Sequence, residues 1–301
     1  MVELNTRENS RLIVTAVPTA VYIRANRAEQ DRYVIDEVIT RDTYRLRNMK
    51  QRGFEPETIV SIGSHIGTFE VIAHALWPEA RIVSVEPNKE SFAILQRNAP
   101  FASAYNVAIT YKTQGIFCDN EVSTGGGFIS TKEEFEHIPE YDSTSGLVAE
   151  KIEHGSVYHI ADENIDRMTF EDLIRAEHLS KIDLLKLDCE GGEWGIIEHL
   201  PIPGLDIRYL VGEWHGVREF AGRRYHDFVK AASAVLPHLT FHGPRPEETY
   251  DCPWGPFFSF PDDEPMIDPD HRPSTLKQGH IHTPFLKRVK RWLIKRIPQD
   301  E

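Results

Sequence analysis

The sequence has few cysteines and fewer basic than acidic residues. Its 301 residues include three cysteines, Cys118, Cys189 and Cys252, which lie far apart and form no C-x-x-C pair. This spacing argues against a disulfide framework and favours a reducing cytoplasm as the location. There are 34 Lys and Arg against 47 Asp and Glu, a formal charge of −13. Because neutralising phosphates takes clustered basic side chains, this balance argues against a nucleic-acid partner.

Long apolar runs are also absent. The apolar run nearest the start, residues 12–23, is interrupted by Thr15, Pro18 and Thr19 and is too short to span a bilayer. It also lacks a persuasive signal-peptide cleavage site. With 40% hydrophobic and 27% charged residues, the composition is that of a globular chain. We therefore expect a soluble cytoplasmic protein with one large domain or two small ones.

The basic residues that are present gather at the end of the chain. Residues 287–296 hold six of them, and apolar residues repeat at helical spacing between Leu286 and Ile297. A basic amphipathic helix can lie on an anionic membrane surface, or it can pack against the acidic body or a second subunit. The shortness of this helix favours packing over a membrane contact.

Strand and helix patterns alternate between residues 58 and 98. Residues 58–63 and 81–86 are short β-branched strands, and apolar residues recur at helical spacing over 69–76 and 92–95. This order predicts a βαβ unit and therefore a parallel sheet.

The alternation returns in the second half. Thr169, with Asp172 three residues on, is a predicted helix N-cap. Residues 182–188 have the pattern of a buried strand, 194–200 that of a helix, and 207–211 that of the next strand.

The turn after the first strand carries the pattern Ser61-Ile-Gly-Ser-His-Ile-Gly67. Glycines at a strand-to-helix turn let the backbone approach a ligand, and the helix N-terminus offers free N–H groups. Glu86 closes the next strand, where nucleotide-binding sheets place a carboxylate that accepts hydrogen bonds from ribose. The alternative is that the glycines only permit a tight turn and that Glu86 is solvated. The strand, the helix, the next strand and its terminal glutamate occur in the expected order, which favours a cofactor site.

The identity of the cofactor follows from a missing glycine. Ser64 and His65 follow Gly63, so the G-x-G-x-x-G pattern that cradles a pyrophosphate is absent, which disfavours a nicotinamide oxidoreductase. S-adenosylmethionine, with an adenosine, an amino-acid end and no phosphate, is the better match. The candidate cofactor residues at this turn and strand end are Gly63, Ser64, His65, Gly67 and Glu86.

Several segments together resemble the FkbM-like S-adenosylmethionine-dependent methyltransferases. They are Val60–Phe69, Val85–Phe92, Asn106–Ile109, Ile182–Glu193 and Tyr209–His215. The resemblance implies a class I methyltransferase fold, an α/β Rossmann-like fold whose seven-stranded, mostly parallel sheet has helices on both faces. It also implies Asn106 and Asp188 as cofactor residues and methylation of hydroxyl oxygens, often on sugars or polyketide products. The chain departs from the family pattern at two places. It has Ser61 where the family commonly has Asp, and Ser64-His65 where the family commonly has Ala-Asn.

Charged residues follow the strand at 182–188. Lys186 and Asp188 share one side by alternation, and Asp188 and Glu190 stand at the carboxyl end where such sheets bind ligands. A local ion pair between Lys186 and Asp188 is the structural alternative. Glu193, in the first turn of the next helix, fits a purely structural role.

Glu213 and His215 end the next strand and share a side, so they should lie near Asp188. Methylating a hydroxyl requires removal of its proton, and His215 titrates in a useful range for that step. A divalent metal ion on Asp188 and Glu213 is the alternative means of activating the hydroxyl. The predicted catalytic set is His215, Asp188, Glu190 and Glu213.

These patterns predict four parts of the chain. They are an N-terminal strand and helix extension over 1–50, an S-adenosylmethionine-binding domain over 51–241, an irregular Pro- and aromatic-rich wrap over 242–285, and the basic tail over 286–301. We expect methyl transfer to a hydroxyl of a small-molecule acceptor, such as a sugar, another polar metabolite or a natural product. The alternative is a non-catalytic or regulatory S-adenosylmethionine-binding module of the same fold.

Overall fold

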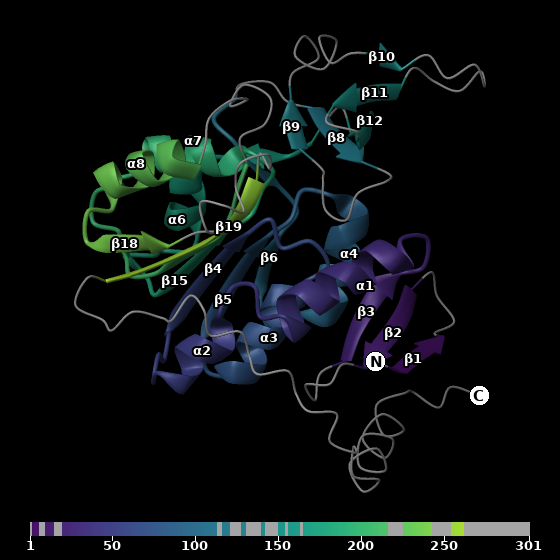
Figure 1. Ribbon diagram of the computed structural model, residues 1–301, viewed down its shortest axis with the longest axis horizontal. Helices are drawn as coiled ribbons and strands as arrows, with labels where there is room; N and C mark the ends of the chain where they lie inside the picture. Colours follow the sequence, from purple (N-terminus) through teal and green to yellow (C-terminus); the bar gives the residue numbers. More distant parts are fainter. Residues whose placement is uncertain are drawn as a thin grey trace, which may run out of the picture.

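A seven-stranded sheet forms the centre of the computed structural model, and helices cover both of its faces (Figure 1). The structure describes residues 2–5, 10–14, 20–112, 116–120, 128–130, 140–141, 150–153, 156–162, 165–215, 225–242 and 254–261. The strands of the central sheet are β4 Thr58–Ile62, β5 Arg81–Val85, β6 Ser103–Tyr105, β15 Leu184–Leu187, β17 Leu210–His215, β18 Leu239–His242 and β19 Trp254–Pro261.

The central sheet has the strand order β18-β19-β17-β15-β4-β5-β6. The strands from β6 to β17 pair in parallel, whereas β19 is antiparallel to both β17 and β18. The chain runs outward from β4 to β5 and β6, then returns to β15 on the other side of β4. The carboxyl ends of β4 and β15 therefore meet at the point where an open α/β sheet binds ligands. The predicted class I methyltransferase fold is confirmed.

Helices form a layer on each face of this sheet (Figure 1). One layer consists of α1 Ala28–Ile35, the π-helical turn η1 Asp36–Thr40, α2 Leu46–Gln51, α3 Thr68–Leu76 and α4 Lys89–Asn98. The other consists of α6 Phe170–Ala176, α7 Gly192–His199 and α8 Tyr225–Val235. At the start of α6, the side chain of Thr169 accepts from the backbone of Asp172 in a capping box, so the predicted N-cap is confirmed.

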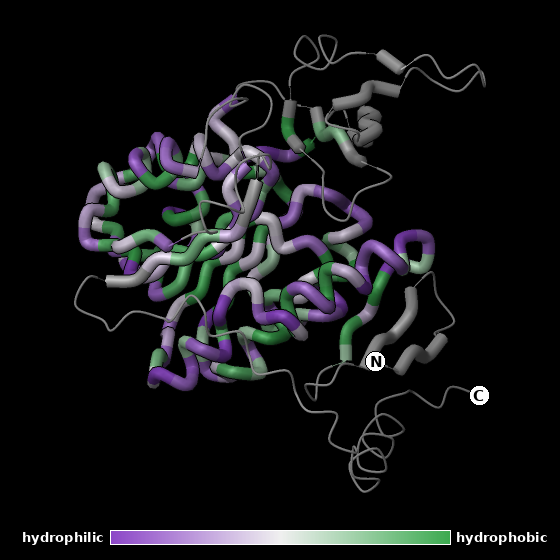
Figure 2. Tube along the Cα trace, viewed as in Figure 1, coloured by the Kyte–Doolittle hydropathy of each residue, from purple (hydrophilic) through white to green (hydrophobic). Residues whose placement is uncertain are grey.

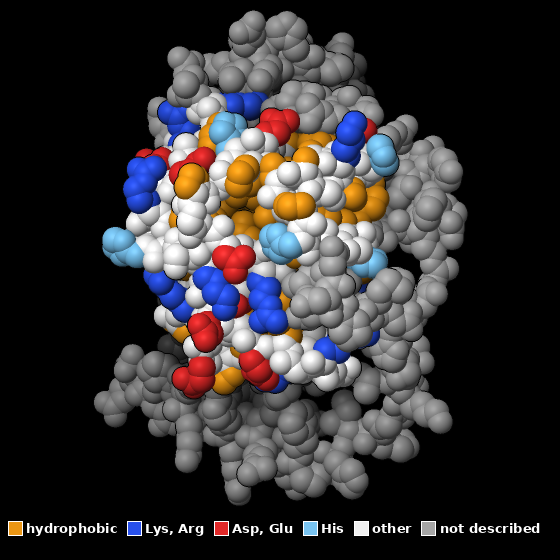
Figure 3. Space-filling view, turned by 90° about the vertical axis from the view of Figure 1, so that its left-hand side faces the viewer, with side chains coloured by type: hydrophobic (Ala, Val, Ile, Leu, Met, Phe, Trp, Pro, Cys, Tyr) orange, Lys and Arg blue, Asp and Glu red, His pale blue; other side chains and the backbone are white. Residues whose placement is uncertain are grey.

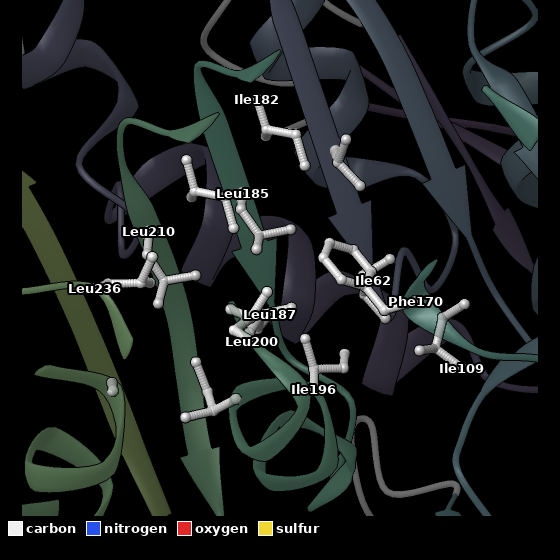
Figure 4. Close-up of a cluster of buried hydrophobic side chains, with 14 of the residues drawn as sticks. Ile62, Ile109, Phe170, Ile182, Leu185, Leu187, Ile196, Leu200, Leu210 and Leu236 are labelled. Carbon is white, nitrogen blue, oxygen red and sulfur yellow. The ribbon is translucent and has the colours of Figure 1, made fainter. Parts of the chain in front are cut away.

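Alternation along the strands divides the core in two. Ile59 and Leu184 pack in the core beneath α1, η1, α2 and α3. Their chain neighbours Val60 and Leu185 turn to the other face, where they join Ile62 in the cluster under α6, α7 and α8 (Figure 4). In Figure 2 the hydrophobic colour follows the central strands, as expected for strands buried on both faces.

One charged residue interrupts the apolar strand β15. Leu184, Leu185 and Leu187 are fully buried, and Lys186 between them is only 3% exposed. By alternation Lys186 lies on the same face as Leu184, toward the layer that contains η1 and α2. Burying an ammonium group without charged or hydrogen-bonding partners costs folding free energy. The partners of Lys186 therefore have to come from that helical layer and from the neighbouring strand ends.

Smaller sheets surround the centre. β1 Val2–Asn5, β2 Ser10–Val14 and β3 Ala20–Arg24 form an antiparallel sheet near the N-terminus. β8 Ile116–Asn120, β9 Phe128–Ser130, β10 Glu140–Tyr141, β11 Glu150–Glu153 and β12 Ser156–Asp162 form an antiparallel sheet in the order β10-β11-β12-β8-β9. Two short parallel pairs join β7 Ala108–Ile109 to β13 Arg167–Met168, and β14 Lys181–Ile182 to β16 Asp206–Ile207.

The structure differs from the sequence analysis at residues 254–261. This segment falls in the predicted irregular wrap, but it forms β19 inside the central sheet, between β17 and β18. Proline residues hid the strand, since Pro256 lies opposite Glu213 within the ladder while Phe257 and Phe258 next to it are buried. The predicted basic tail, 286–301, lies outside the described residues.

Charges of both signs are mixed on the face shown in Figure 3, where described Lys and Arg side chains lie among Asp and Glu both above and below a group of hydrophobic ones. The acidic balance of the chain is therefore not a single-sign patch on that face. Among the described residues, no helix combines the length and the apolar character needed to cross a membrane.

Gly212 allows the close contact between β15 and β17, so replacing it should destabilise the fold. It pairs with Leu187, and a Cβ at this position would lie 1.6 Å from the Leu187 carbonyl oxygen. We expect Gly212→Ala to lower the free energy of unfolding by about 3 kcal/mol, measured by urea denaturation followed by circular dichroism. Gly204→Ala is the matched control, because a Cβ there meets nothing within 4 Å and costs only about 1 kcal/mol for its left-handed backbone. Equal losses in the two variants would contradict this account.

Candidate active site

The turn between β4 and α3 brings the backbone of two strands into contact. Gly63 has φ +80°, and a Cβ there would lie 1.8 Å from the carbonyl oxygen of Asp188. Gly67, with φ +83°, begins α3 against Leu95. The N–H groups of Gly63 and Ser64 both donate to the Val85 carbonyl, 3.0 Å away. The two predicted glycines are thus required by positive φ and close approach, which is the property that the cofactor prediction used.

Glu86 lies directly after β5, beside this turn. Its carboxylate accepts from the backbone N–H of His65 at 2.7 Å and from that of Asn88 at 2.8 Å. Burial raises its pKa to about 7, although those two hydrogen bonds act in the opposite direction. The side-chain amide of Asn106 donates to the carbonyls of Glu86 and Pro87, which fixes the loop that carries the carboxylate.

The two departures from the family pattern have their side chains in contact with protein. Ser64 is buried, and its hydroxyl lies 3.2 Å from that of Ser61. His65 has φ +51°, and its Nε2 lies 2.6 Å from the guanidinium of Arg24, which also forms a buried ion pair with Asp31. Burial, followed by the Arg24 charge, holds the pKa of His65 well below its usual value. The imidazole is therefore neutral.

Lys186 and Asp188 are paired at the end of β15. The ammonium of Lys186 donates to the Gly63 carbonyl at 2.5 Å and lies 3.3 Å from Asp188 Oδ2. The hydroxyl of Tyr44 donates to the same Oδ2 at 2.5 Å. Burial opposes ionisation of Asp188, but Lys186, His215 and the Tyr44 hydrogen bond together lower its pKa below the usual value. Asp188 is therefore an anion at neutral pH.

His215 lies among carboxylates at the end of β17. Its Nδ1 is 3.0 Å from Glu193 Oε1, and its Nε2 is 3.6 Å from Glu190 and 3.7 Å from Glu213. Burial alone would lower the pKa of His215, but Glu190 and Glu193 outweigh it and raise the pKa to about 10. Glu193 is fully buried and also accepts from the backbone N–H of His215 and Gly191, so it positions this strand end.

The pKa of the Glu213 carboxyl is raised. Burial, and then the charge of Asp188, raises its pKa to about 8. The side chain of Glu213 is 19% exposed, those of Asp188 and Glu190 are each 24% exposed, and that of His215 is 4% exposed. An incoming molecule therefore reaches the three carboxylates first, and the imidazole lies behind them.

The structure brings the four predicted catalytic residues together, and three of them could hold a metal ion. One ligand atom each from Asp188, Glu213 and His215 lies within 4.8 Å of the others. Glu193 contacts Nδ1 of His215, so Nε2 of His215 is turned toward the carboxylates of the cluster. A metal-binding histidine usually has one ring nitrogen held by a carboxylate in this way. Two carboxylates and an imidazole suit a divalent ion, so the residues fit.

Sequence reasoning missed two residues that approach this cluster from the segment before β4. Tyr44 contacts Asp188 directly, and Glu37 is close enough that the Asp188 charge, after burial, raises its pKa. Glu37 belongs to the π-helical turn η1, a type of distortion common at functional sites. No periodic signal marks either residue, because Tyr44 lies in a turn and Glu37 in a single irregular helical turn.

Known proteins with similar sequences are methyltransferases. A family model described as Methyltransferase FkbM domain matches residues 61–242. A curated relative, Methyltransferase sdnD of Sordaria araneosa, is 25% identical over a 191-residue alignment that covers 55% of this chain and 67% of the relative.

Solved structures with a similar arrangement include the plantazolicin methyltransferase BpumL in complex with SAH, at 10% identity and a TM-score of 0.40 over 78% of this chain and 89% of that one. A SAM-dependent methyltransferase from Agrobacterium tumefaciens matches at 8% identity and a TM-score of 0.39, over 85% and 72% of the two chains. These scores are too low to carry an argument, and the family match does not depend on them. Because that match covers more than half of its residues, the chain belongs to the FkbM family of S-adenosylmethionine-dependent methyltransferases.

Proposed function

We propose that this protein transfers the methyl group of S-adenosylmethionine to a hydroxyl oxygen of a small polar acceptor, such as a sugar, another polar metabolite or a natural product. The observation that carries the proposal is the group of accessible carboxylates, Asp188, Glu190 and Glu213, at the strand ends beside the Gly63 turn. A hydroxyl has to lose its proton as it attacks the methyl carbon, and these groups can accept it.

Cofactor binding is assigned to the ends of β4 and β5. The Glu86 carboxylate would accept hydrogen bonds from the ribose hydroxyls, and the turn from Gly63 through Ser64 and His65 to Gly67 would border the amino-acid end through its backbone. Asn106 supports this site by holding the loop after Glu86, and Asp188 adjoins it through the backbone contact with Gly63. In this proposed arrangement the sulfonium methyl would lie near the carboxylates at the ends of β15 and β17.

The reaction then needs little covalent chemistry from the protein. The acceptor oxygen attacks the methyl carbon, the bond from that carbon to sulfur breaks, and S-adenosylhomocysteine leaves as a neutral thioether. We assign the proton of the hydroxyl to the ionised form of Glu213, which a pKa of about 8 makes the major form only above about pH 8, and which lies next to the cationic His215. His215, behind the carboxylates, would stabilise the ionised form of Glu213 rather than contact the acceptor. Most of the acceleration would come from alignment of oxygen, carbon and sulfur.

A divalent ion is the second means of activating the hydroxyl. Held by Asp188, Glu213 and His215, it would lower the pKa of a hydroxyl as a Lewis acid. Chelation distinguishes the two means: full activity after exhaustive EDTA treatment supports direct proton transfer to Glu213. Activity lost to EDTA and restored by added Mg²⁺ or Mn²⁺ supports the ion.

Cofactor affinity should depend on pH through Glu86. With a pKa of about 7, its carboxylate is largely protonated at pH 6 and largely ionised at pH 8, and only the ionised form accepts from both ribose hydroxyls. Calorimetry should show S-adenosylhomocysteine binding about tenfold more weakly at pH 6 than at pH 8.

Glu86→Gln should bind more weakly at pH 8 and lose this pH dependence, whereas the exposed neighbour Glu90→Gln should behave like the parent protein. Unchanged binding in Glu86→Gln would overturn the ribose assignment.

Glu213→Gln separates catalysis from cofactor binding. We expect kcat to fall by about 100-fold or more, while the affinity for S-adenosylhomocysteine stays within about threefold, because the proton acceptor is lost and the cofactor contacts are kept. The assay follows S-adenosylhomocysteine release with a panel of sugars and polyols, and mass spectrometry locates the new methyl group. A parent protein that binds cofactor but methylates no acceptor would favour the non-catalytic module. Unchanged turnover in Glu213→Gln would show that another group takes the proton.

A further inference from the structure

The segment before the family domain supplies a side chain to the active site. Tyr44 lies between η1 and α2, outside residues 61–242, yet its hydroxyl reaches Asp188 at the far end of β15. The side chain is almost fully buried, with its ring edge-on to Phe69 of α3. Its ring also lies under the Lys186 ammonium, 5.6 Å from the centroid. Tyr44 therefore touches both members of the Lys186–Asp188 pair.

The backbone around Tyr44 is held in an unusual conformation. Asp42 and Arg45, on either side of it, have φ +57° and +60°, in the region that non-glycine residues rarely adopt. Arg47 pins the turn, since its guanidinium donates to the carbonyls of Ile39 and Thr40 at the end of η1. Strained backbone persists where its surroundings over-determine it, and such residues gather at functional sites.

The two contacts on Asp188 fall on the same oxygen. Tyr44 donates to Oδ2, and the Lys186 ammonium lies against Oδ2 as well. Among the described residues, no hydrogen bond to Oδ1 is formed. The pair of contacts thus fixes the rotation of the carboxylate and leaves its second oxygen, on a side chain 24% exposed, for a ligand.

We propose that Tyr44 is a positioning residue that holds Asp188 with one carboxylate oxygen turned toward the cationic centre of the bound cofactor. The inference rests on the proposed cofactor site, because Asp188 adjoins the Gly63 turn at which the amino-acid end is placed. Without the Tyr44 hydroxyl, the carboxylate is free to turn both oxygens toward Lys186, and the negative charge that faces the cofactor falls.

Two cofactor analogues test this without knowledge of the acceptor. Sinefungin carries a protonated amine where S-adenosylmethionine has its sulfonium methyl, whereas S-adenosylhomocysteine is uncharged at that position. In Tyr44→Phe, which keeps the packing on Phe69, calorimetry should show sinefungin binding weakened by at least about fivefold and S-adenosylhomocysteine binding changed by less than about twofold. Tyr33→Phe is the matched control, because Tyr33 is exposed on α1, and both affinities should stay unchanged.

A second variant tests whether Tyr44 acts through Asp188. Asp188→Asn should also weaken sinefungin binding relative to S-adenosylhomocysteine binding. The double variant, with both Tyr44→Phe and Asp188→Asn, should bind sinefungin no more weakly than Asp188→Asn alone. A further loss in the double variant, or an unchanged sinefungin preference in Tyr44→Phe, overturns the inference while the proposed function stands. If Tyr44→Phe does not fold, Asp188→Asn provides the test. An unchanged ratio of sinefungin to S-adenosylhomocysteine affinity in Asp188→Asn would also overturn the role proposed for Tyr44. Failure of the parent protein to bind either analogue would instead overturn the proposed cofactor site and this inference with it.

Discussion

The buried ammonium of Lys186 is the constraint on which the site depends. It lies within a strand whose other residues are fully buried leucines, and a charge in that position is tolerated only with partners. Three parts of the chain provide them: the Gly63 carbonyl from the turn between β4 and α3, Asp188 from the end of the same strand, and the ring of Tyr44 from the N-terminal segment. Folding the strand correctly therefore brings the Gly63 turn and the acidic cluster together.

The charges at the strand ends are arranged in depth. Asp188, Glu190 and Glu213 form the accessible layer, and His215 lies behind them with Glu193 fixing its far nitrogen. The positive charge of His215 and the ammonium of Lys186 lie beside these carboxylates, and we propose that the accessible layer faces a cationic cofactor. Methyl transfer turns the sulfonium into a neutral thioether, so the attraction weakens as the reaction proceeds and product release becomes easier.

The sequence predicted the parts of this site that local patterns determine. Strand ends, strand alternation and glycine turns are determined by residues close together in the sequence. The sequence alone therefore placed Gly63, Glu86, Asp188 and Glu213 at the carboxyl edge of the sheet. Tyr44 and Glu37 could not, because their approach depends on how the segment before β4 packs against β15, across more than a hundred residues. β19 escaped prediction for a local reason, since proline interrupts its strand pattern.

We propose that the cofactor spans the Gly63 turn, with its ribose on Glu86 and its sulfur facing Asp188 and Glu213. A crystal structure of the protein with S-adenosylhomocysteine tests it most directly. We predict both ribose hydroxyls within hydrogen-bonding distance of the Glu86 carboxylate and the sulfur on the side of the sheet edge occupied by Asp188 and Glu213. Ligand bound at another edge of the sheet, or with its ribose away from Glu86, would contradict the account.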